Sequence, residues 1–275
     1  MFDDETAVER AGPGEWSAAI SSAWNIGEVP NGGYSLAIVL GAIARDAGHV
    51  DPLSVTCHFL RPVGPGRPAI VTTDVVRSGR TVSTVCGRLR QDGKERLVVM
   101  AAMGDLAGTE AAAGGGTAGD EPTGAGPGGW ADVEPPDLPP PDRCVARTGD
   151  AQGVALALRS RVEVRLHPDQ AEPGVGGDAE MSGWIRFADG RPPDARGLVL
   201  FADAFPPSLF GRLGRVGWVP TIELTVHVRR RPAPGWVMGR FRCDDLDGGR
   251  MIEDGALWDA DGRLVARARQ LGLLL

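Results

Sequence analysis

The chain has 275 residues and a formal net charge of −7 at pH 7. This acidic balance argues against nucleic acid or an anionic membrane surface as the main partner. The first ten residues, MFDDETAVER, are acidic and polar and fit neither a signal peptide nor a transit peptide. The four cysteines contain no CxxC pair, which favours a cytoplasmic protein with free thiols and no structural zinc. The length suits one large domain or two smaller ones.

The segment from Pro30 to Arg61 predicts a buried helix followed by a strand. Its first residues, PNGG, form a turn that leaves backbone amides free at a helix start. Tyr34–Ala44 is apolar or small at nearly every position, so a helix there must be buried on all sides. Its roughly 11 residues are too few to cross a bilayer. Pro52 separates it from a strand-like run, Val55–Leu60. We therefore expect a sheet curled around one central helix, the hotdog arrangement.

The rest of the first half fits that arrangement. Residues 1–29 form a short section, a strand or a cap over the core. Three strand-like runs follow the first strand, and turn residues separate them. These runs are Ala69–Arg77, Thr81–Gln91 and Arg96–Met103.

The composition changes near Gly104, where a segment rich in Gly, Ala and Pro begins. We interpret residues 107–143 as a linker between an N-terminal domain, 1–106, and a C-terminal domain, 144–275, because such a composition buries too little surface to order fully. Residues Gly114–Gly119 match the GxGxxG pattern. No strand precedes them and no amphipathic helix follows, so we expect no phosphate site there.

The second half repeats the pattern of a helix with strands. Gly197–Leu213 is mostly apolar, and Pro206-Pro207 must kink the helix or split it in two. The predicted strands are Val154–His167, Ala179–Phe187, Thr221–Arg230, Trp236–Cys243, Met251–Trp258 and Leu264–Leu271.

The two halves overlay with a constant shift of 169 residues. His58 then matches His227, Arg61 matches Arg230, and several turn residues match without a gap. Turn geometry limits residue choice, so these matches indicate a duplicated unit. The same shift places Tyr34 on Asp203. The first half therefore lacks that carboxylate, and we expect one competent site per chain, in the second half.

With these features the chain resembles the type II acyl-CoA thioesterases, which fuse two hotdog domains. The resemblance implies an α+β double hotdog, with two antiparallel sheets joined into one and each wrapped around a helix. Its carriers are Asn31-Gly32-Gly33-Tyr34, Cys57–Pro62, Gly79–Ser83, Phe201–Phe205, Pro220–Glu223, Asp261–Ala266 and Arg269-Gln270.

The resemblance assigns the hydrolytic water to Asp203, Thr221 and Gln270. Asp203 is the only ionisable residue between Arg196 and Arg212, and burial of a carboxylate raises its basicity. Each residue has a structural alternative. Asp203 can cap a helix or pair with a buried arginine, Thr221 can simply begin a strand, and Gln270 can be an exposed strand residue.

The candidate substrate-binding residues lie mostly in the first half. Backbone amides at a helix start can polarise the thioester carbonyl, as in an oxyanion hole. A histidine in a strand is also common in a core, and an arginine in a turn is commonly solvated. The candidates are Asn31, Gly32, Gly33, Tyr34, His58 and Arg80.

The expected activity is hydrolysis of an acyl-CoA to the free acid and coenzyme A, with no metal and no cofactor beyond the coenzyme A of the substrate. The absence of GxSxG argues against an α/β-hydrolase. One alternative is a hotdog thioesterase, dehydratase or acyltransferase acting on acyl carrier protein, although the chain lacks the Asp-x-x-x-x-His run of a dehydratase. Another is an acyl-thioester binding protein without turnover. The resemblance also implies a homodimer or a larger homo-oligomer.

Overall fold

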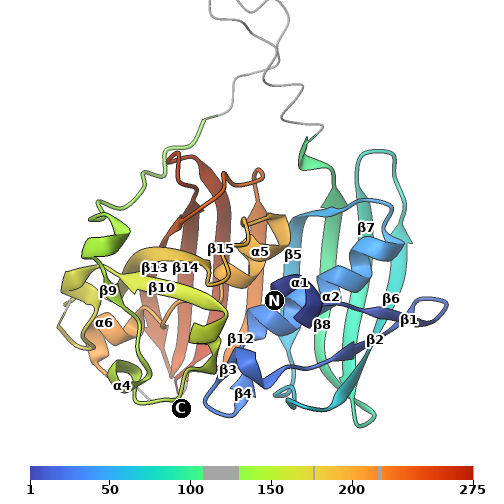
Figure 1. Cartoon of the computed structure of the whole chain (residues 1–275), viewed down its shortest axis with the longest axis horizontal. Coiled ribbons are helices and arrows are strands. Elements are labelled where there is room, and N and C mark those ends of the chain that lie inside the picture. The colour runs from blue at the N-terminus through green and yellow to red at the C-terminus, as the bar shows by residue number, and fades with distance from the viewer. Residues whose placement is uncertain (108–129, 176, 216–218, 275) are drawn as a thin grey trace, which may run out of the picture.

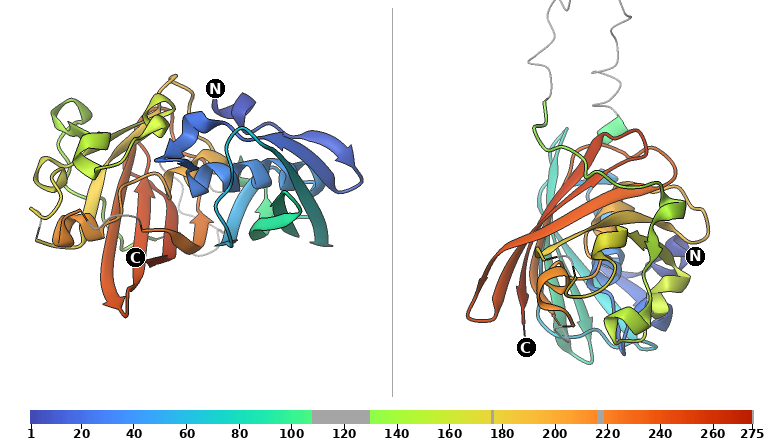
Figure 2. Two further views of the ribbon diagram at one scale, coloured as in Figure 1. Left: turned by 90° about the horizontal axis from the view of Figure 1, so that it is seen from below. Right: turned by 90° about the vertical axis from the view of Figure 1, so that its left-hand side faces the viewer.

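The computed structural model describes residues 1–107, 130–175, 177–215 and 219–274. Its two halves lie side by side and share one antiparallel sheet, as Figures 1 and 2 show. The thirteen strands of this sheet run in the order β1-β2-β6-β7-β8-β5-β12-β15-β14-β13-β11-β10-β9. The predicted double hotdog is confirmed, because each half wraps its strands around one central helix.

The first half contains two complete α-helices and eight strands among the residues described. Its helices are α1 (Phe2–Glu5) and the central α2 (Gly32–Asp46). Its strands are β1 (Glu9–Gly12), β2 (Glu15–Ala19), β3 (Asn25–Ile26), β4 (Val29–Pro30), β5 (Asp51–Phe59), β6 (Pro68–Arg77), β7 (Ser83–Gln91) and β8 (Lys94–Gly104).

The second half has a more divided set of helices. They are α4 (Gly149–Gln152), the central α5 (Ala195–Phe201) and α6 (Leu209–Leu213). The strands are β9 (Val145–Ala146), β10 (Val162–Leu166), β11 (Glu180–Phe187), β12 (Thr221–Val228), β13 (Val237–Asp247), β14 (Arg250–Trp258) and β15 (Leu264–Leu273).

Helix α2 is the buried helix that the sequence predicts. The Asn31 side chain caps it by accepting a hydrogen bond from the backbone N–H of Tyr34 at 3.0 Å. Ten of its fifteen residues are buried. It ends before Gly48, whose φ of 71° only glycine adopts readily. The helix has no polar face, and its burial on every side agrees with this composition.

The second central helix is much shorter. The carboxylate of Asp194 caps α5 by accepting from the N–H of Gly197 at 2.6 Å. The helix ends at Phe201, and α6 begins only after Pro206-Pro207. The predicted split is therefore confirmed, since proline lacks the N–H that a continuing helix needs. The turn between the two helices carries Asp203.

The halves meet at β5 and β12, which pair antiparallel in the middle of the sheet. The hydroxyls of Thr56 and Thr225, 169 positions apart, hydrogen-bond across this pair at 2.9 Å. The shift of 169 thus holds for the strands. The helix caps, Asn31 and Asp194, are only 163 positions apart. The overlay of Tyr34 on Asp203 is therefore wrong, and the helical counterpart of Asp203 is Leu40.

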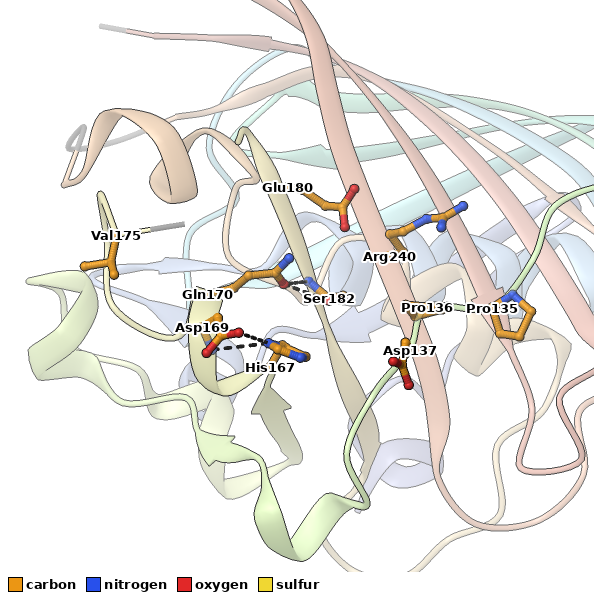
Figure 3. Close-up of a pocket in the computed structure, with 10 residues that line it drawn as sticks. All are labelled: Pro135, Pro136, Asp137, His167, Asp169, Gln170, Val175, Glu180, Ser182 and Arg240. Carbon is orange, nitrogen blue, oxygen red and sulfur yellow. Dashed lines mark hydrogen bonds and ion pairs between the residues drawn. The ribbon is translucent and has the colours of Figure 1, made fainter. Parts of the chain in front are cut away.

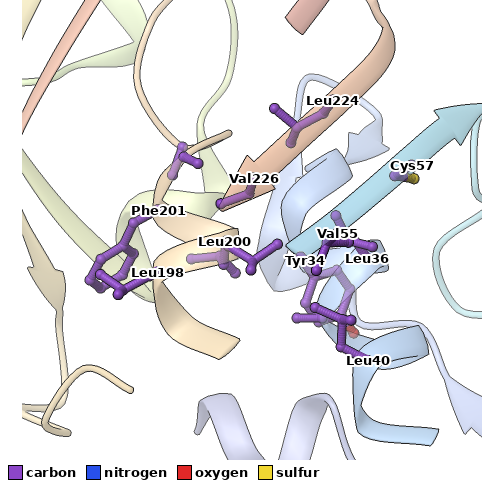
Figure 4. Close-up of a cluster of buried hydrophobic side chains, with 14 of the residues drawn as sticks. Tyr34, Leu36, Leu40, Val55, Cys57, Leu198, Leu200, Phe201, Leu224 and Val226 are labelled. Atoms are coloured by element: carbon purple, nitrogen blue, oxygen red, sulfur yellow. The ribbon is translucent and has the colours of Figure 1, made fainter. Parts of the chain in front are cut away.

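Side chains from both halves form one continuous core. Figure 4 shows that the buried residues of α2, α5, β5 and β12 meet between the two helices. The first helix, α1, also joins the halves. Phe2 packs against Phe187 with ring centroids 4.8 Å apart, and Glu5 pairs with Arg161 at 2.7 Å. No helix in the described ranges is long and apolar enough to cross a membrane.

Two segments differ from the sequence predictions. Only Val162–Leu166 of the predicted strand Val154–His167 is a strand. The residues before it turn toward the first half instead, where Gly27 N–H donates to the carbonyl of Ala155 at 2.7 Å. Part of the predicted linker packs on the second half through Val133 and Leu138, and Trp184 Nε1 donates to the carbonyl of Pro139 at 2.8 Å. Residues Gly114–Gly119 lie outside the described residues.

Candidate active site

A cavity of about 590 Å³ opens where the two halves meet, and both contribute to its wall. Its polar side chains gather around the turn after α5, while much of the remaining wall is apolar. The residues that matter for the chemistry are Asn31, Gly32, Arg147, Asp203, Thr221, Glu253 and Gln270. The apolar wall includes Phe59, Phe205, Phe210, Phe241 and Met251.

The Asp203 carboxylate is held by the N-terminus of α2. Its Oδ2 accepts from the backbone N–H of Gly33 at 2.8 Å and from Asn31 Nδ2 at 2.9 Å. Asn31 Nδ2 also donates to the Asp203 carbonyl at 2.8 Å. Exposed N–H groups and the helix dipole favour an anion at this position. The first half thus binds the carboxylate that the second half supplies.

The close contact between the halves explains the glycine at position 33. A Cβ on Gly33 would lie 2.9 Å from the carbonyl oxygen of Leu200 and 3.0 Å from the Cβ of Asp203. Such distances are shorter than side chains tolerate. The missing side chain lets α2 approach the turn closely enough for its N–H to reach the carboxylate.

Burial raises the pKa of Asp203 to about 6, and the nearby negative charge of Glu253 acts in the same direction. Hydrogen bonds from the N–H of Gly33 and from Asn31 oppose this shift. The carboxylate is therefore ionised at neutral pH but far more basic than an exposed aspartate. That basicity suits a group that removes a proton from water.

Thr221 and Gln270 lie beside Asp203, so the structure brings the three predicted catalytic residues together. Thr221 Oγ1 is 3.0 Å from Gln270 Oε1 and 3.4 Å from Asp203 Oδ1. Gln270 lies on β15. Thr221 begins β12 at a bulge, where the register shifts between Thr221 and Glu223. A bulge redirects side chains, and both Thr221 and Ile222 line the cavity.

Besides Asp203 and the exposed Arg61, two ionisable residues line the site, and the sequence reasoning missed both. Glu253, on β14, is 3% exposed. Gln270 Nε2 donates to its Oε1 in a very short hydrogen bond, and the N–H of Ser208 donates to its Oε2 at 2.7 Å. Burial raises the pKa of Glu253. Strand alternation alone could have identified it, because Glu253 falls on the same buried face as Met251 and Gly255.

The second missed residue is Arg147, which follows β9 and is 5% exposed. Its guanidinium donates to the Ala204 carbonyl, and its Nε donates to Gln152 Oε1 at 2.7 Å. Burial lowers its pKa to about 9, and the charge of Asp203 opposes this shift. Arg147 is therefore still cationic at neutral pH. No sequence pattern around it points to a site.

Of the six predicted substrate-binding residues, three lie at the site and three do not. Asn31 and Gly32 line the cavity, and Gly33 contacts Asp203. Tyr34 is fully buried and stacks on Trp24 with ring centroids 4.9 Å apart. Its hydroxyl donates to the carbonyl of Glu5 at 2.8 Å and accepts from Ser21 N at 3.0 Å. Tyr34 is thus a core residue, which corrects the prediction.

His58 and Arg80 also lie away from the cavity. Cys57 points into the core, so its strand neighbour His58 points to the outer face, where it is exposed. Arg80 is exposed in the turn between β6 and β7. Neither residue contributes to the cavity wall, and the predicted contacts with substrate are corrected accordingly.

A second hollow, of about 580 Å³, lies on the outer side of the second half (Figure 3). It is bounded by part of the segment 130–143. Its polar groups bind one another, since Gln170 Oε1 accepts from both the N–H and the hydroxyl of Ser182 at 2.7 Å. It lacks the buried pair of carboxylates found in the first cavity, which is therefore the better candidate for catalysis.

Comparison with known proteins identifies the family of the chain. Residues 20–107 match the family model of the acyl-CoA thioesterase N-terminal domain, and residues 135–274 match that of the C-terminal domain. An uncharacterized protein of Mycobacterium tuberculosis is 27% identical over 93% of this chain and 89% of its own. The thioesterase-like protein TwmA of Talaromyces wortmannii is 23% identical over 100% of this chain and 92% of its own.

Two solved structures show the same fold along the whole chain. A putative thioesterase II from Thermobifida fusca is 30% identical, with a TM-score of 0.81, covering 100% of this chain and 97% of that one. A hot dog protein of unknown function from Alicyclobacillus acidocaldarius is 23% identical, with the same TM-score and coverage. Two matched domains and a shared architecture lead to one conclusion: the chain belongs to the acyl-CoA thioesterase family.

Proposed function

We propose that this protein hydrolyses an acyl-CoA thioester with a water molecule that Asp203 activates. The observation that carries the proposal is the geometry of the carboxylate. Its Oδ2 is occupied by donors from α2, while its Oδ1 lies beside Thr221 in the cavity wall. A buried base with a pKa of about 6 and one available oxygen suits proton removal from water.

The reaction follows from this arrangement. The oxygen of the water attacks the thioester carbonyl carbon as its proton passes to Asp203 Oδ1, with Thr221 and Gln270 orienting the water. The C–S bond then breaks, and the departing thiolate receives the proton from Asp203. The products are a free acid and coenzyme A, and the carboxylate is restored.

The N–H of Gly32 is suited to stabilise the developing oxyanion. Gly32 lines the cavity at the first position of α2. The next two amides bind Asp203 Oδ2 and Asn31 Oδ1. Among the residues that the structure describes, no acceptor is hydrogen-bonded to the Gly32 N–H. One such donor contributes about 3 kcal/mol to transition-state stabilisation.

The apolar wall supplies a place for the acyl chain, and Phe59, Phe205 and Phe241 form part of it. A binding protein without turnover would be favoured if Asp203 were salt-bridged away from the cavity. Instead, Asp203 lines the cavity and forms no ion pair within the described ranges. This observation favours the enzyme over the binding protein.

The decisive experiment measures thiol release from short, medium and long acyl-CoAs, with the wild type beside Asp203→Asn. We expect a loss of roughly 10²-fold or more in kcat, the scale of general-base catalysis. Asp245→Asn, on an exposed part of β13, is the matched control and should keep full activity. Equal rates for wild type and Asp203→Asn would exclude Asp203 as the base.

If no acyl-CoA is turned over, the next substrates are the same acyl groups on acyl carrier protein. A protein that binds both thioesters and hydrolyses neither would be the non-catalytic alternative. A homodimer or larger assembly stays a prediction, which sedimentation velocity can check.

A further inference from the structure

Asp203, Thr221, Gln270 and Glu253 form one hydrogen-bonded row across the site. Thr221 Oγ1 lies between Asp203 Oδ1 and Gln270 Oε1, and Gln270 Nε2 continues the row to Glu253. Glu253 and Gln270 are direct partners on neighbouring strands. The far end of the row is fixed, because Ser208 N–H holds Glu253 Oε2.

A hydroxyl has one proton and can donate it in one direction only. The distance to Gln270 Oε1, 3.0 Å, is that of a good hydrogen bond, whereas the distance to Asp203 Oδ1 is 3.4 Å. The Thr221 proton therefore goes to Gln270. This direction leaves Asp203 Oδ1 free to accept a proton from water.

The direction depends on which end of the Gln270 amide faces Thr221. Both oxygens of Glu253 accept hydrogen bonds, one from Gln270 Nε2 and one from the N–H of Ser208, so the NH₂ group of Gln270 lies on the side of Glu253. The amide oxygen must then face Thr221. A neutral partner at position 253 could donate instead, which would turn the amide around and send the Thr221 proton to Asp203.

We propose that Glu253 is a positioning residue that fixes the amide orientation of Gln270 and so keeps Asp203 Oδ1 available to water. Its role in turnover rests on the proposed thioesterase function. Glu253 acts through Gln270, and we assign it no contact with the reacting atoms.

The charges around Glu253 come from several elements. Asp203 follows α5, Cys243 lies on β13, and Asp254 lies on β14 itself. Each interacts electrostatically with Glu253. The positive charge of Arg147 interacts with Asp203, at the other end of the row. Replacing Glu253 by a neutral residue removes a negative charge near Asp203, so it lowers the pKa of that carboxyl.

The first test needs no substrate. Side-chain NMR of the full chain compares wild type with Glu253→Gln, which keeps the volume, and Gln270→Ala identifies the Gln270 signals. We expect the Gln270 NH₂ resonances to lose their carboxylate-bonded shift in Glu253→Gln, and the Asp203 carboxyl to titrate at lower pH. Unchanged Gln270 resonances would overturn the proposal, whether or not the protein is a thioesterase.

The second test is a double-mutant cycle on kcat. If Glu253 acts through Gln270, Glu253→Gln lowers kcat about tenfold in the wild type and less than about twofold in the Gln270→Ala background, because coupled residues are not additive. KM should not change. Equal losses in both backgrounds would show a separate structural role and contradict the proposal. Absence of turnover in the wild type would instead contradict the proposed function.

Discussion

At matching positions around the site, the second half of this protein carries polar residues and the first half carries apolar ones. Gln270 on β15 corresponds to Ala101 on β8 with the shift of 169, and helix positions correspond with a shift of 163. The strand partners of these two residues, Glu253 on β14 and Val85 on β7, are 168 positions apart. Four polar residues of the site thus have apolar counterparts in the first half. Asp203, Thr221, Gln270 and Glu253 correspond to Leu40, Pro52, Ala101 and Val85.

The lengths of the central helices explain how this difference is accommodated. Helix α2 runs for 15 residues, so Leu40 lies in its middle and is buried in the core. Helix α5 has only 7 residues, and Asp203 follows it in a turn beside the cavity. Because α5 is short, Asp203 lies in a turn outside the packed helix, where its carboxylate can contact a substrate.

The first half nevertheless contributes to the site through Asn31 and Gly33. The corresponding cap in the second half, Asp194, faces a hollow of about 430 Å³ that Leu40 and Pro52 also line. Its carboxylate is occupied by the Gly197 N–H and by an ion pair with Arg191 at 2.6 Å. One half therefore supplies the donors, and the other supplies the base.

The largest expected effect on turnover comes from Gly33→Ala, which pushes the N-terminus of α2 away from the turn that carries Asp203. In Gly33→Ala the new Cβ collides with backbone atoms of Leu200, so the N–H moves away from Asp203. We expect kcat to fall about 10²-fold, because the carboxylate is displaced from the position in which it meets the water, and stability to fall by about 1–3 kcal/mol through overpacking. Steady-state kinetics and urea unfolding measure both effects.

Gly64→Ala is the control for that substitution, because the nearest atoms to its Cβ would be side-chain atoms of Arg67, at 3.3 Å, and Gln91, at 3.6 Å, and not backbone. If both alanine variants behave alike, contact between the halves is not what the glycine provides.

Removing the hydroxyl of Thr221 should have the next largest effect. Thr221→Val keeps the shape but deletes the link between Asp203 and Gln270. A hydrogen bond between uncharged groups contributes about 0.5–1.5 kcal/mol, so kcat should fall roughly 2- to 10-fold with KM unchanged. Thr225→Val, on the outer face of the same strand, should keep full activity. A rise in KM alone would assign Thr221 to binding instead.

The activity of the wild type should depend on the ionisation of Asp203. With a pKa of about 6, only about one tenth of the carboxylate is ionised at pH 5, so kcat/KM should be about tenfold lower at pH 5 than at pH 8. A pH–rate profile measures this directly. A flat profile between pH 5 and 8 would contradict a base with this pKa.

The raised pKa of Asp203 also predicts how the stability of the fold changes with pH. Because the folded-state pKa of Asp203 lies above its unfolded value of about 3.9, the protonated group stabilises the fold below about pH 4, and this contribution is lost as pH rises through 6. The loss amounts to about 3 kcal/mol, from about two pKa units. The difference in unfolding free energy between Asp203→Asn and wild type should grow between pH 4 and pH 8 by that amount.

The smallest effect on turnover is expected from placing the glutamine of the second half into the first. Ala101 is fully buried, and no polar partner matches those of Gln270 there. Ala101→Gln should therefore cost about 1–3 kcal/mol, the penalty of a buried polar group without partners, and leave kcat nearly unchanged. Thermal unfolding and kinetics test this. An unchanged Tm would show that the first half also tolerates polar groups.

Much of this architecture could be predicted from the sequence, because hydrophobic patterns and turn residues act locally. The apolar run at 34–44 requires a buried helix, and Pro206-Pro207 requires a break in the second one. Matching turn residues revealed the duplication. Asp203 could be identified because burying a carboxylate in a long apolar stretch is costly unless it has a binding partner or a functional role.

The tertiary structure decided what no local pattern encodes. Helix length, and not the constant shift of the strands, determines that Asp203 corresponds to Leu40. A bulge turns Thr221 toward the cavity, against simple strand alternation. Arg147 reaches the site only because its segment folds back beside the turn after α5. These features depend on contacts between residues distant in the chain, and such contacts leave no periodic signal in the sequence.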